Sequence, residues 1–555
     1  MIAVERRLGI MKQDAVGAVW YASVPSAAFP VRACSEGTMA VHRLPVILPP
    51  WGVVGALAAM LVAATALVPA SAAEARRTNV LFIAVDDLRP EFGAYGSRLV
   101  KSPHLDALAA KGVVFHRAYC QQAVCSPSRS SLLTGARPDT TKVYDLVTHF
   151  RTAMPDVVTL PQLFKQSGYV VQGMGKLFHA GFDDPRSWSV PWQKPDAPRY
   201  AVPSHQALDA TFAAEEARRD RAAARRSSGE AGNPKPATRA NSRGPACESA
   251  DVADSAYHDG ELADMAIQAL RTLAAGQEPF WLGVGFIRPH LPFVAPRRYW
   301  DLYDREAIPL AANRFRPHGS PDYAIVSAGE LRAYRDIPGG EISDDLARTL
   351  KHGYYAALSY MDAQLGRVIA ELERLGLADS TIVVVWGDHG WKLGEHDAWC
   401  KHSNMELDTR APLIMCVPGM RHAGESTDAL VEFVDIYPTL AELCGLPLPK
   451  HLEGTSFVPV LDDPGRAWKS AAFSQYPRRV RGKRLMGYSM RTDRYRLTRW
   501  IHRDDPMQVD AVELFDEQED PQENTNVATD PARASVLADL TAQWHRGWQA
   551  AGPRP

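Results

Sequence analysis

Short apolar segments alternate along this chain with segments of helical character. The clearest apolar segments are residues 79–85 (NVLFIAV), 169–172, 280–286 and 381–386. Short runs without polar interruption are typical of strands that are buried on both faces. The alternation predicts an α/β fold in which helices flank a mostly parallel sheet.

Polar residues follow each of these predicted strands. Because parallel strands in an open α/β sheet end at one edge, where ligands bind, we expect these residues to share one crevice. They are Asp86 and Asp87, Lys176 and His179, His290, and Asp388 and His389.

The pattern changes in the last quarter of the chain. Residues 431–437 predict a helix, and Pro447-Leu448-Pro449 predicts a linker after it. We therefore place a large α/β domain at 73–450 and a smaller α+β subdomain at 451–555. Strands around 485–500 and 512–515 should form an antiparallel sheet there, covered by a helix at 534–548.

An apolar run near the start, residues 53–68, precedes an Ala-Ser-Ala sequence at 70–72. The run is short for a membrane span, so it predicts a signal peptide at 39–72; an uncleaved anchor is the alternative. Met39 is the more natural start, which makes 1–38 an untranslated extension. We expect an exported protein, periplasmic or secreted, with no stable membrane insertion.

Residues 215–244 are rich in Arg, Ala, Ser, Gly and Pro and lack apolar periodicity. They predict a mobile insertion, either a solvated loop or a contact for an anionic polysaccharide.

Composition narrows the possible functions. The 555 residues are 46% hydrophobic and 23% charged, which is ordinary for a globular protein, and the net charge is only -2. This balance argues against a nucleic-acid partner, which needs a basic footprint. Seven cysteines without a C-x-x-C pair argue against a zinc ribbon.

The sequence Cys125-Ser126-Pro127-Ser128-Arg129 carries the most specific chemistry. Proline suits the first turn of a helix, so Cys125 should lie at a helix N-terminus, with Arg129 on the same side four residues later. A thiol, a cation and free backbone N–H groups would then surround an anion. The alternative is a partly buried cysteine beside a surface arginine.

Three carboxylates, Asp86, Asp87 and Asp388, stand at two of the strand ends. Each acidic group alone could cap a helix, but two buried groups together are explained by a cation. Oxygen ligands suit calcium or magnesium better than zinc. His389 could ligate the cation or hydrogen-bond to a ligand.

The cysteine segment, followed by Leu133-Thr134-Gly135, resembles the signature of the type I sulfatases. Four further blocks of sequence resemble one subgroup, the iduronate-2-sulfatases and their bacterial relatives, and occur in the same order along the chain. They are VDDLRPEFGAYG, which precedes the cysteine segment, and GKLFHAG, RPHLPFVAP and GDHGWKLGEHDAWCKHSN, which come after it. The likeness extends over about residues 78–528.

The resemblance implies an alkaline-phosphatase-like α/β/α sandwich. It implies that a maturation enzyme converts Cys125 to formylglycine and that Asp86, Asp87, Asp388 and His389 hold a calcium ion with the modified residue. Arg129, Lys176, His179, His290 and Lys401 would surround the sulfate. A hydroxyl of the hydrated aldehyde would attack sulfur, and the substrate would be a sulfated carbohydrate, most closely a 2-O-sulfated uronic acid.

Two other functions stay open. One is hydrolysis of phosphate esters or phosphonates with the same site geometry, and the other is noncatalytic binding of sulfated glycans. His396 and His402 are expected at the surface. The basic cluster of Arg478, Arg479, Arg481, Lys483 and Arg484 is expected to be a solvated turn or a sugar contact.

Overall fold

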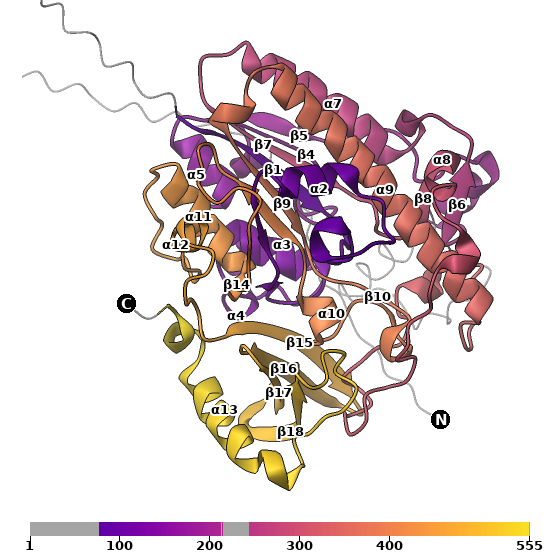
Figure 1. Ribbon diagram of the computed structural model, residues 1–555, viewed down its shortest axis with the longest axis vertical. Coiled ribbons are helices and arrows are strands. Elements are labelled where there is room, and N and C mark those ends of the chain that lie inside the picture. The colour runs from indigo at the N-terminus through magenta and orange to yellow at the C-terminus, as the bar shows by residue number, and fades with distance from the viewer. Residues whose placement is uncertain (1–76, 213, 215–242, 554–555) are drawn as a thin grey trace, which may run out of the picture. The chain divides into compact units, whose positions relative to one another are not determined.

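A mixed eight-stranded sheet forms the centre of the computed structural model, which describes residues 77–212, 214 and 243–553 (Figure 1). The predicted extension at 1–38 and signal peptide at 39–72 lie outside the described residues, as does the predicted insertion apart from Arg243 and Gly244. Residues Ala73–Pro555 group into one compact unit by their contacts.

The sheet confirms the predicted arrangement. All its strand pairs are parallel except those of β12, which runs antiparallel to both of its neighbours. In spatial order the strands are β13 (Ser426–Thr427), β2 (Val113–Phe115), β12 (Leu413–Cys416), β9 (Thr381–Gly387), β1 (Asn79–Val85), β7 (Phe280–Phe286), β4 (Val170–Gly175) and β5 (Val190–Gln193).

Helices cover both faces of this sheet. On one face, odd-numbered residues of β1 such as Ile83 pack against α2 (Pro103–Ala109), α7 (His258–Ala274) and α9 (Asp344–Arg374). On the other face, even-numbered residues such as Phe82 pack against α3 (Cys125–Thr134), α5 (Leu160–Gln166), α11 (Ile436–Leu443) and α12 (Val458–Asp462). The result is the α/β/α sandwich expected from the sequence.

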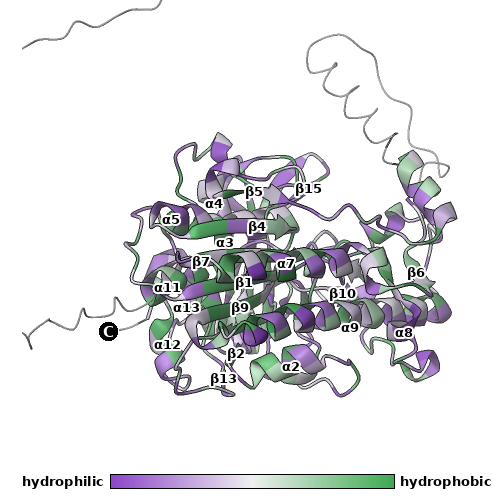
Figure 2. Ribbon diagram, turned by 90° about the horizontal axis from the view of Figure 1, so that it is seen from above, coloured by the Kyte–Doolittle hydropathy of each residue, from purple (hydrophilic) through white to green (hydrophobic). Residues whose placement is uncertain are grey.

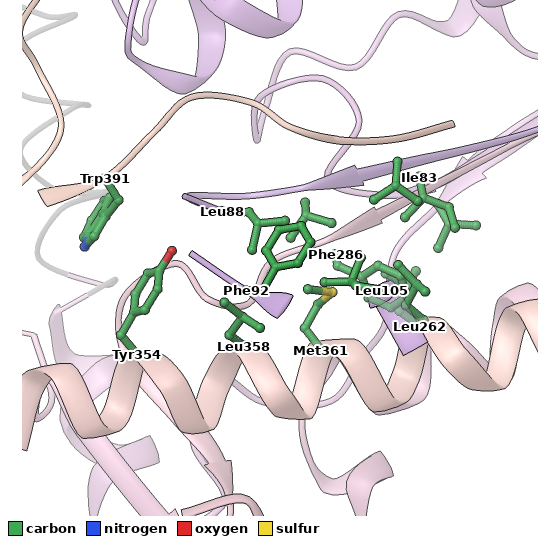
Figure 3. Close-up of a cluster of buried hydrophobic side chains, with 14 of the residues drawn as sticks. Ile83, Leu88, Phe92, Leu105, Leu262, Phe286, Tyr354, Leu358, Met361 and Trp391 are labelled. Carbon is green, nitrogen blue, oxygen red and sulfur yellow. The ribbon is translucent and has the colours of Figure 1, made fainter. Parts of the chain in front are cut away.

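Helix α9 shows how one long element joins the core to the strand ends. It carries hydrophobic and hydrophilic residues along its length (Figure 2). Leu358 and Met361 point from it toward Phe92 and Phe286, while Tyr354 reaches toward the region of Trp391 (Figure 3).

A second sheet follows α12. Its four antiparallel strands are β15 (Ala472–Val480), β16 (Lys483–Arg491), β17 (Tyr495–His502) and β18 (Asp505–Asp516). Helix α13 (Ala534–Arg546) packs on it through Leu540 and Trp544. The predicted antiparallel sheet and covering helix are thus confirmed, although β15 was not predicted as a strand.

The remaining elements are short. Three two-stranded sheets pair β10 (Lys392–Leu393) with β11 (Trp399–Cys400), β3 (Ala118–Tyr119) with β14 (Val431–Glu432), and β6 (Cys247–Ala250) with β8 (Phe293–Pro296). The short helices are α4 (Pro138–Thr141), α8 (Arg297–Trp300) and α10 (Glu406–Thr409).

Two predicted helix boundaries were wrong. The helix predicted at 431–437 begins only at Ile436, because Val431 and Glu432 pair with β3 and a 3-10 turn follows them. The last helix ends at Arg546 rather than at Trp548, since Gly547 takes a positive φ of 74° that stops it. Across the described residues, no helix combines the length and apolar character needed to cross a membrane.

Candidate active site

The ends of four adjacent strands bring the predicted site residues together. Asp86 and Asp87 follow β1, Lys176 follows β4, His290 lies four residues after β7, and Asp388 follows β9. Asp87 has a φ of 58°, so the chain turns sharply after β1. Helix α9 holds this turn, because the Tyr354 hydroxyl donates to the Asp87 carbonyl oxygen at 2.8 Å.

Cys125 opens helix α3, as the proline at position 127 predicted. Its side chain is 2% exposed, and its Sγ lies 3.5 Å from Asp86 Oδ1, 3.5 Å from His389 Nε2 and 3.6 Å from Lys176 Nζ. Arg129 is fully buried, so the alternative of a surface arginine is wrong. Burial and the nearby Asp86 charge raise the pKa of the Cys125 thiol well above its usual range.

Arg129 ties helix α3 to two of the strand ends. Its Nε donates to Asp388 Oδ2 at 2.9 Å, and Nη2 donates to Asp86 Oδ1 at 3.1 Å. Nη1 donates to the backbone carbonyl oxygens of Lys176 and Leu177. A planar guanidinium presents five N–H donors in a fixed fork, whereas an ammonium presents three from a single nitrogen.

Four of the residues predicted to ligate a cation form one buried cluster. Asp86, Asp87, Cys125 and His389 each offer a ligand atom, and these atoms all lie within 4.8 Å of one another. Asp388 stands beside the cluster, with Oδ1 3.5 Å from His389 Nε2 and Oδ2 bound by Arg129. Its role as a ligand stays a prediction.

The donor set of this cluster suits a cation. His389 Nδ1 faces the Gly390 carbonyl oxygen at 2.9 Å and therefore carries a hydrogen, which leaves Nε2 as the ring nitrogen that can ligate a cation. That nitrogen lies 3.4 Å from Asp87 Oδ1 and 3.5 Å from Asp388 Oδ1. Acceptors that face one another in a buried site are stabilised by a positive ion between them.

The two aspartates after β1 differ in electrostatics. For Asp86, burial opposes ionisation, but the charges of Lys176, His290 and Arg129 outweigh it and hold the pKa well below the usual range. For Asp87, burial and the adjacent Asp86 charge raise the pKa despite the opposing charge of Lys401.

Lys401 joins the site from the loop after β11. Its Nζ lies 3.0 Å from Asp87 Oδ1 and 4.8 Å from the centre of the Trp391 ring. Its third neighbour is Glu330, whose Oε2 is 2.7 Å away and whose Oε1 is 3.0 Å from His290 Nε2. Sequence analysis missed Glu330, because it lies in an irregular stretch with no strand before it.

His179 also lies among these groups. Burial and the nearby Lys176 charge lower the pKa of His179 to about 3, so its ring is neutral at ordinary pH. Its Nδ1 is buried and has no hydrogen-bond partner among the described residues. A neutral ring nitrogen of this kind can accept a hydrogen bond.

Two expectations near Lys401 were wrong. His396, expected at the surface, is 1% exposed because its Nε2 hydrogen-bonds to the Gln522 carbonyl oxygen at 2.8 Å. His402 is also partly buried, and burial with the nearby Lys401 charge lowers its pKa to about 3.

The basic cluster divides into two parts. Arg478 is no solvated residue: it donates to the carbonyl oxygens of Tyr323, Ala324 and His402 and lies over the Tyr476 ring. The other members are exposed around the β15–β16 turn, as expected: Arg479, Arg481, Lys483 and Arg484.

Comparison with known proteins agrees with this geometry. The Sulfatase family model matches residues 78–446, and the model for the C-terminal region of N-sulphoglucosamine sulphohydrolase matches residues 394–549. Iduronate 2-sulfatase of the mouse, Mus musculus, is 34% identical over 537 residues, which cover 83% of this chain and 93% of that protein.

Two solved structures share the fold. A protein in complex with its substrate D-glucosamine-2-N,6-O-disulfate has a TM-score of 0.64 and 21% identity, covering 85% of this chain and 99% of its own. Phosphonate monoester hydrolase from Silicibacter pomeroyi also has a TM-score of 0.64, with 24% identity, covering 86% of this chain and 99% of its own. These findings confirm the family resemblance and the alkaline-phosphatase-like fold expected from the sequence.

Proposed function

Because the chain belongs to the sulfatase family, and is therefore a sulfuric ester hydrolase, we propose that it removes sulfate from 2-O-sulfated uronic acid residues of a carbohydrate. The convergence of Cys125, the acidic cluster and the buried cations at one edge of the sheet carries this proposal. The substrate follows from the 34% identity to iduronate 2-sulfatase over most of both chains.

The cluster fits the two groups that sulfatase chemistry requires. Asp86, Asp87 and His389, with residue 125 and Asp388, would hold a calcium ion, which supplies polarisation of a sulfate oxygen. Formylglycine made from Cys125 supplies the nucleophilic hydroxyl. The raised pKa of the thiol supports the need for conversion, since a protonated thiol is a poor nucleophile.

Side chains of the protein stabilise the charge on the sulfate and transfer the protons. Arg129, Lys176 and Lys401 present positive charge to the sulfate oxygens, where negative charge grows in the transition state. An oxygen of Asp388 accepts the proton of the attacking hydroxyl, and His290 or Lys401 donates one to the leaving sugar oxygen. Nδ1 of His179 takes the proton of the second hydroxyl of the hydrated aldehyde, and this step allows sulfate to leave.

The first test is mass spectrometry of the peptide that contains Cys125, on protein from a host able to make formylglycine. We expect a loss of about 18 Da from the cysteine peptide, the difference between a thiol and an aldehyde side chain. A peptide that carries only cysteine, in a host whose control sulfatase is converted, would contradict the catalytic proposal. The purified protein should then release sulfate from a 2-O-sulfated uronate.

Paired substrates test the phosphoryl alternative. The likeness to a phosphonate monoester hydrolase is a likeness of fold and does not choose between sulfate and phosphate. We expect kcat/KM to favour an aryl sulfate over the matching aryl phosphate and phosphonate. The reverse preference would overturn the sulfatase proposal in favour of a phosphoester or phosphonate hydrolase.

A glycan-binding measurement tests the noncatalytic alternative. Converted wild-type protein should turn over the sulfated sugar, whereas Cys125→Ala should bind the sugar without turnover. Binding without turnover by both proteins would favour a sulfated-glycan binder.

We place the protein outside the cytoplasm. The apolar run at 53–68 and the small residues at 70–72 support export to the periplasm or the medium. Sequencing the N-terminus of protein from the native producer tests this, with a first residue near Ala73 as the expected result.

A further inference from the structure

One carboxylate outside the predicted catalytic set joins the two candidate proton donors. Glu330 precedes the short 3-10 helix Leu331–Ala333, in an irregular stretch before α9. Each of its two oxygens contacts a different residue: Oε1 lies 3.0 Å from His290 Nε2, and Oε2 lies 2.7 Å from Lys401 Nζ. The side chain is 19% exposed, so water screens these pairs only weakly.

Both ring nitrogens of His290 contact the surrounding protein. Nδ1 is 2.6 Å from the Leu291 carbonyl oxygen, and Nε2 faces Glu330. A carbonyl and a carboxylate can only accept, so each ring nitrogen of His290 already has an acceptor beside it.

Lys401 differs from His290 because an ammonium has three N–H donors. Asp87 approaches Nζ with Oδ1 at 3.0 Å and Oδ2 at 3.3 Å, and Glu330 approaches it with Oε2 at 2.7 Å. The centre of the Trp391 ring lies 4.8 Å away. The two Asp87 oxygens can share one N–H and Glu330 takes a second, so the third N–H can serve the substrate.

Glu330 is ionised in this setting. Burial opposes its charge, but Lys401 and His290 hold the pKa of the carboxyl well below its usual range. It also lies outside the cluster predicted to bind the metal, so its two contacts do not compete with ligation.

We infer that Glu330 is a positioning residue, which aims Lys401 at the leaving oxygen and holds the His290 ring beside it. As the S–O bond breaks, its electron pair moves to the sugar oxygen, which takes a proton from Lys401 Nζ and leaves a neutral amine. This inference rests on the proposed sulfatase function and assigns the donor that was left open between His290 and Lys401.

The test compares two leaving groups in the converted, metal-loaded protein. A sugar alkoxide needs a proton to depart, whereas the anion released from para-nitrophenyl sulfate departs without one. For Glu330→Gln, we expect kcat on the 2-O-sulfated uronate to fall about 10- to 100-fold and kcat on the aryl sulfate to change by less than about threefold. The exposed Glu341→Gln is the matched control and should change neither rate.

An equal fall in kcat on both substrates would show that Glu330 has only a structural role. An unchanged kcat on both would show that it has no role in the reaction. Either result overturns the inference. If Glu330→Gln fails to fold, as judged by its melting temperature, Glu330→Asp keeps the charge with a shorter reach and must show the same split between substrates. Wild-type protein that turns over neither substrate would instead refute the proposed function, and the inference with it.

Discussion

Arg129 shows how much of the site depends on the shape of one side chain. It is fully buried and bridges Asp86 and Asp388, the acids that follow two adjacent strands. A buried charge is tolerable only when it is paired and hydrogen-bonded, and here every branch of the guanidinium has an acceptor. The residue therefore fixes the positions of both acids, in addition to the sulfate contact proposed for it.

Replacing Arg129 by lysine should be costly although the charge stays. The three tetrahedral donors of an ammonium cannot reproduce the planar fork that reaches both carboxylates and the Lys176 carbonyl, so we expect kcat on a sulfate ester to fall at least about 100-fold. Breaking the buried pairs should lower the unfolding free energy by about 3–5 kcal/mol. Denaturant unfolding and steady-state kinetics measure both, with the exposed Arg374→Lys as control. A variant within a few-fold of wild type would refute this role.

Metal removal tests the acidic cluster. We expect a calcium chelator to abolish activity and lower the melting temperature, because Asp86, Asp87 and His389 then face one another without the metal ion between them. Added calcium should restore both. Asp87→Asn should lose the calcium-dependent shift in melting temperature, whereas the exposed Asp379→Asn should keep it. A melting temperature that is indifferent to calcium in the wild type would contradict the metal assignment.

At the scale of elements, β7 and β4 approach so closely that glycine is required. A Cβ at Gly285 would lie 2.3 Å from the backbone carbon and oxygen of Lys176, and Lys176 N donates to the Gly285 carbonyl oxygen at 2.8 Å. This close packing sets the position from which Lys176 reaches Asp86. The backbones of these two strands thus set the position of Lys176, a candidate catalytic cation.

Gly285→Ala should therefore act on the site through β4. The added methyl must push Lys176 away, so we expect lower kcat and a lower melting temperature. Gly339→Ala is the matched control, since nothing lies within 4 Å of its Cβ position. Unchanged kinetics in Gly285→Ala would show that the strand spacing adapts without moving Lys176.

At the scale of the whole molecule, a buried ionic network joins the second sheet to the rest of the protein. Glu406 of α10 pairs with Arg491 and Arg496 of the second sheet. Glu517, after β18, also pairs with Arg491, and Glu523 pairs with Arg496. The network thus contains three carboxyl groups and two guanidinium groups. Burial opposes the charge of Glu406, but the two arginines lower its pKa to about 2, while burial and the like charges of Glu406 and Glu523 raise the pKa of Glu517 well above 4.5.

Glu517→Gln should stabilise the protein at neutral pH. A carboxyl with a raised folded pKa favours folding below its unfolded value near 4.5, and this contribution is lost as pH rises through the folded pKa. Glutamine does not ionise, so the variant avoids the destabilisation that ionised Glu517 causes. Its melting temperature should therefore exceed that of wild type at pH 7–8, and the difference should shrink toward about pH 4. The exposed Glu519→Gln is the control. A lower melting temperature at pH 7 would mean that Glu517 is ionised and paired.

Much of the fold and site could be predicted from the sequence because the signals were local. Apolar runs gave the strands, and the polar residues directly after them gave Asp86, Lys176, His290 and Asp388. Glu330 could not be found in this way, since it reaches the site from an irregular stretch through tertiary packing.

The errors have the same physical origin. His396 looks like a surface histidine in sequence, and only its bond to Gln522, 126 residues later, shows that it is buried. Val431 and Glu432 fit a helix locally, but pairing with β3 makes them a strand.

The burial of Cys125 sets an order of events in the life of the molecule. A side chain that is 2% exposed, at the first turn of a wholly buried helix, offers no access to another enzyme. The conversion proposed for Cys125 is therefore expected to precede folding, while the segment is still extended. On that proposal, a chain that folds with an unmodified cysteine stays inactive.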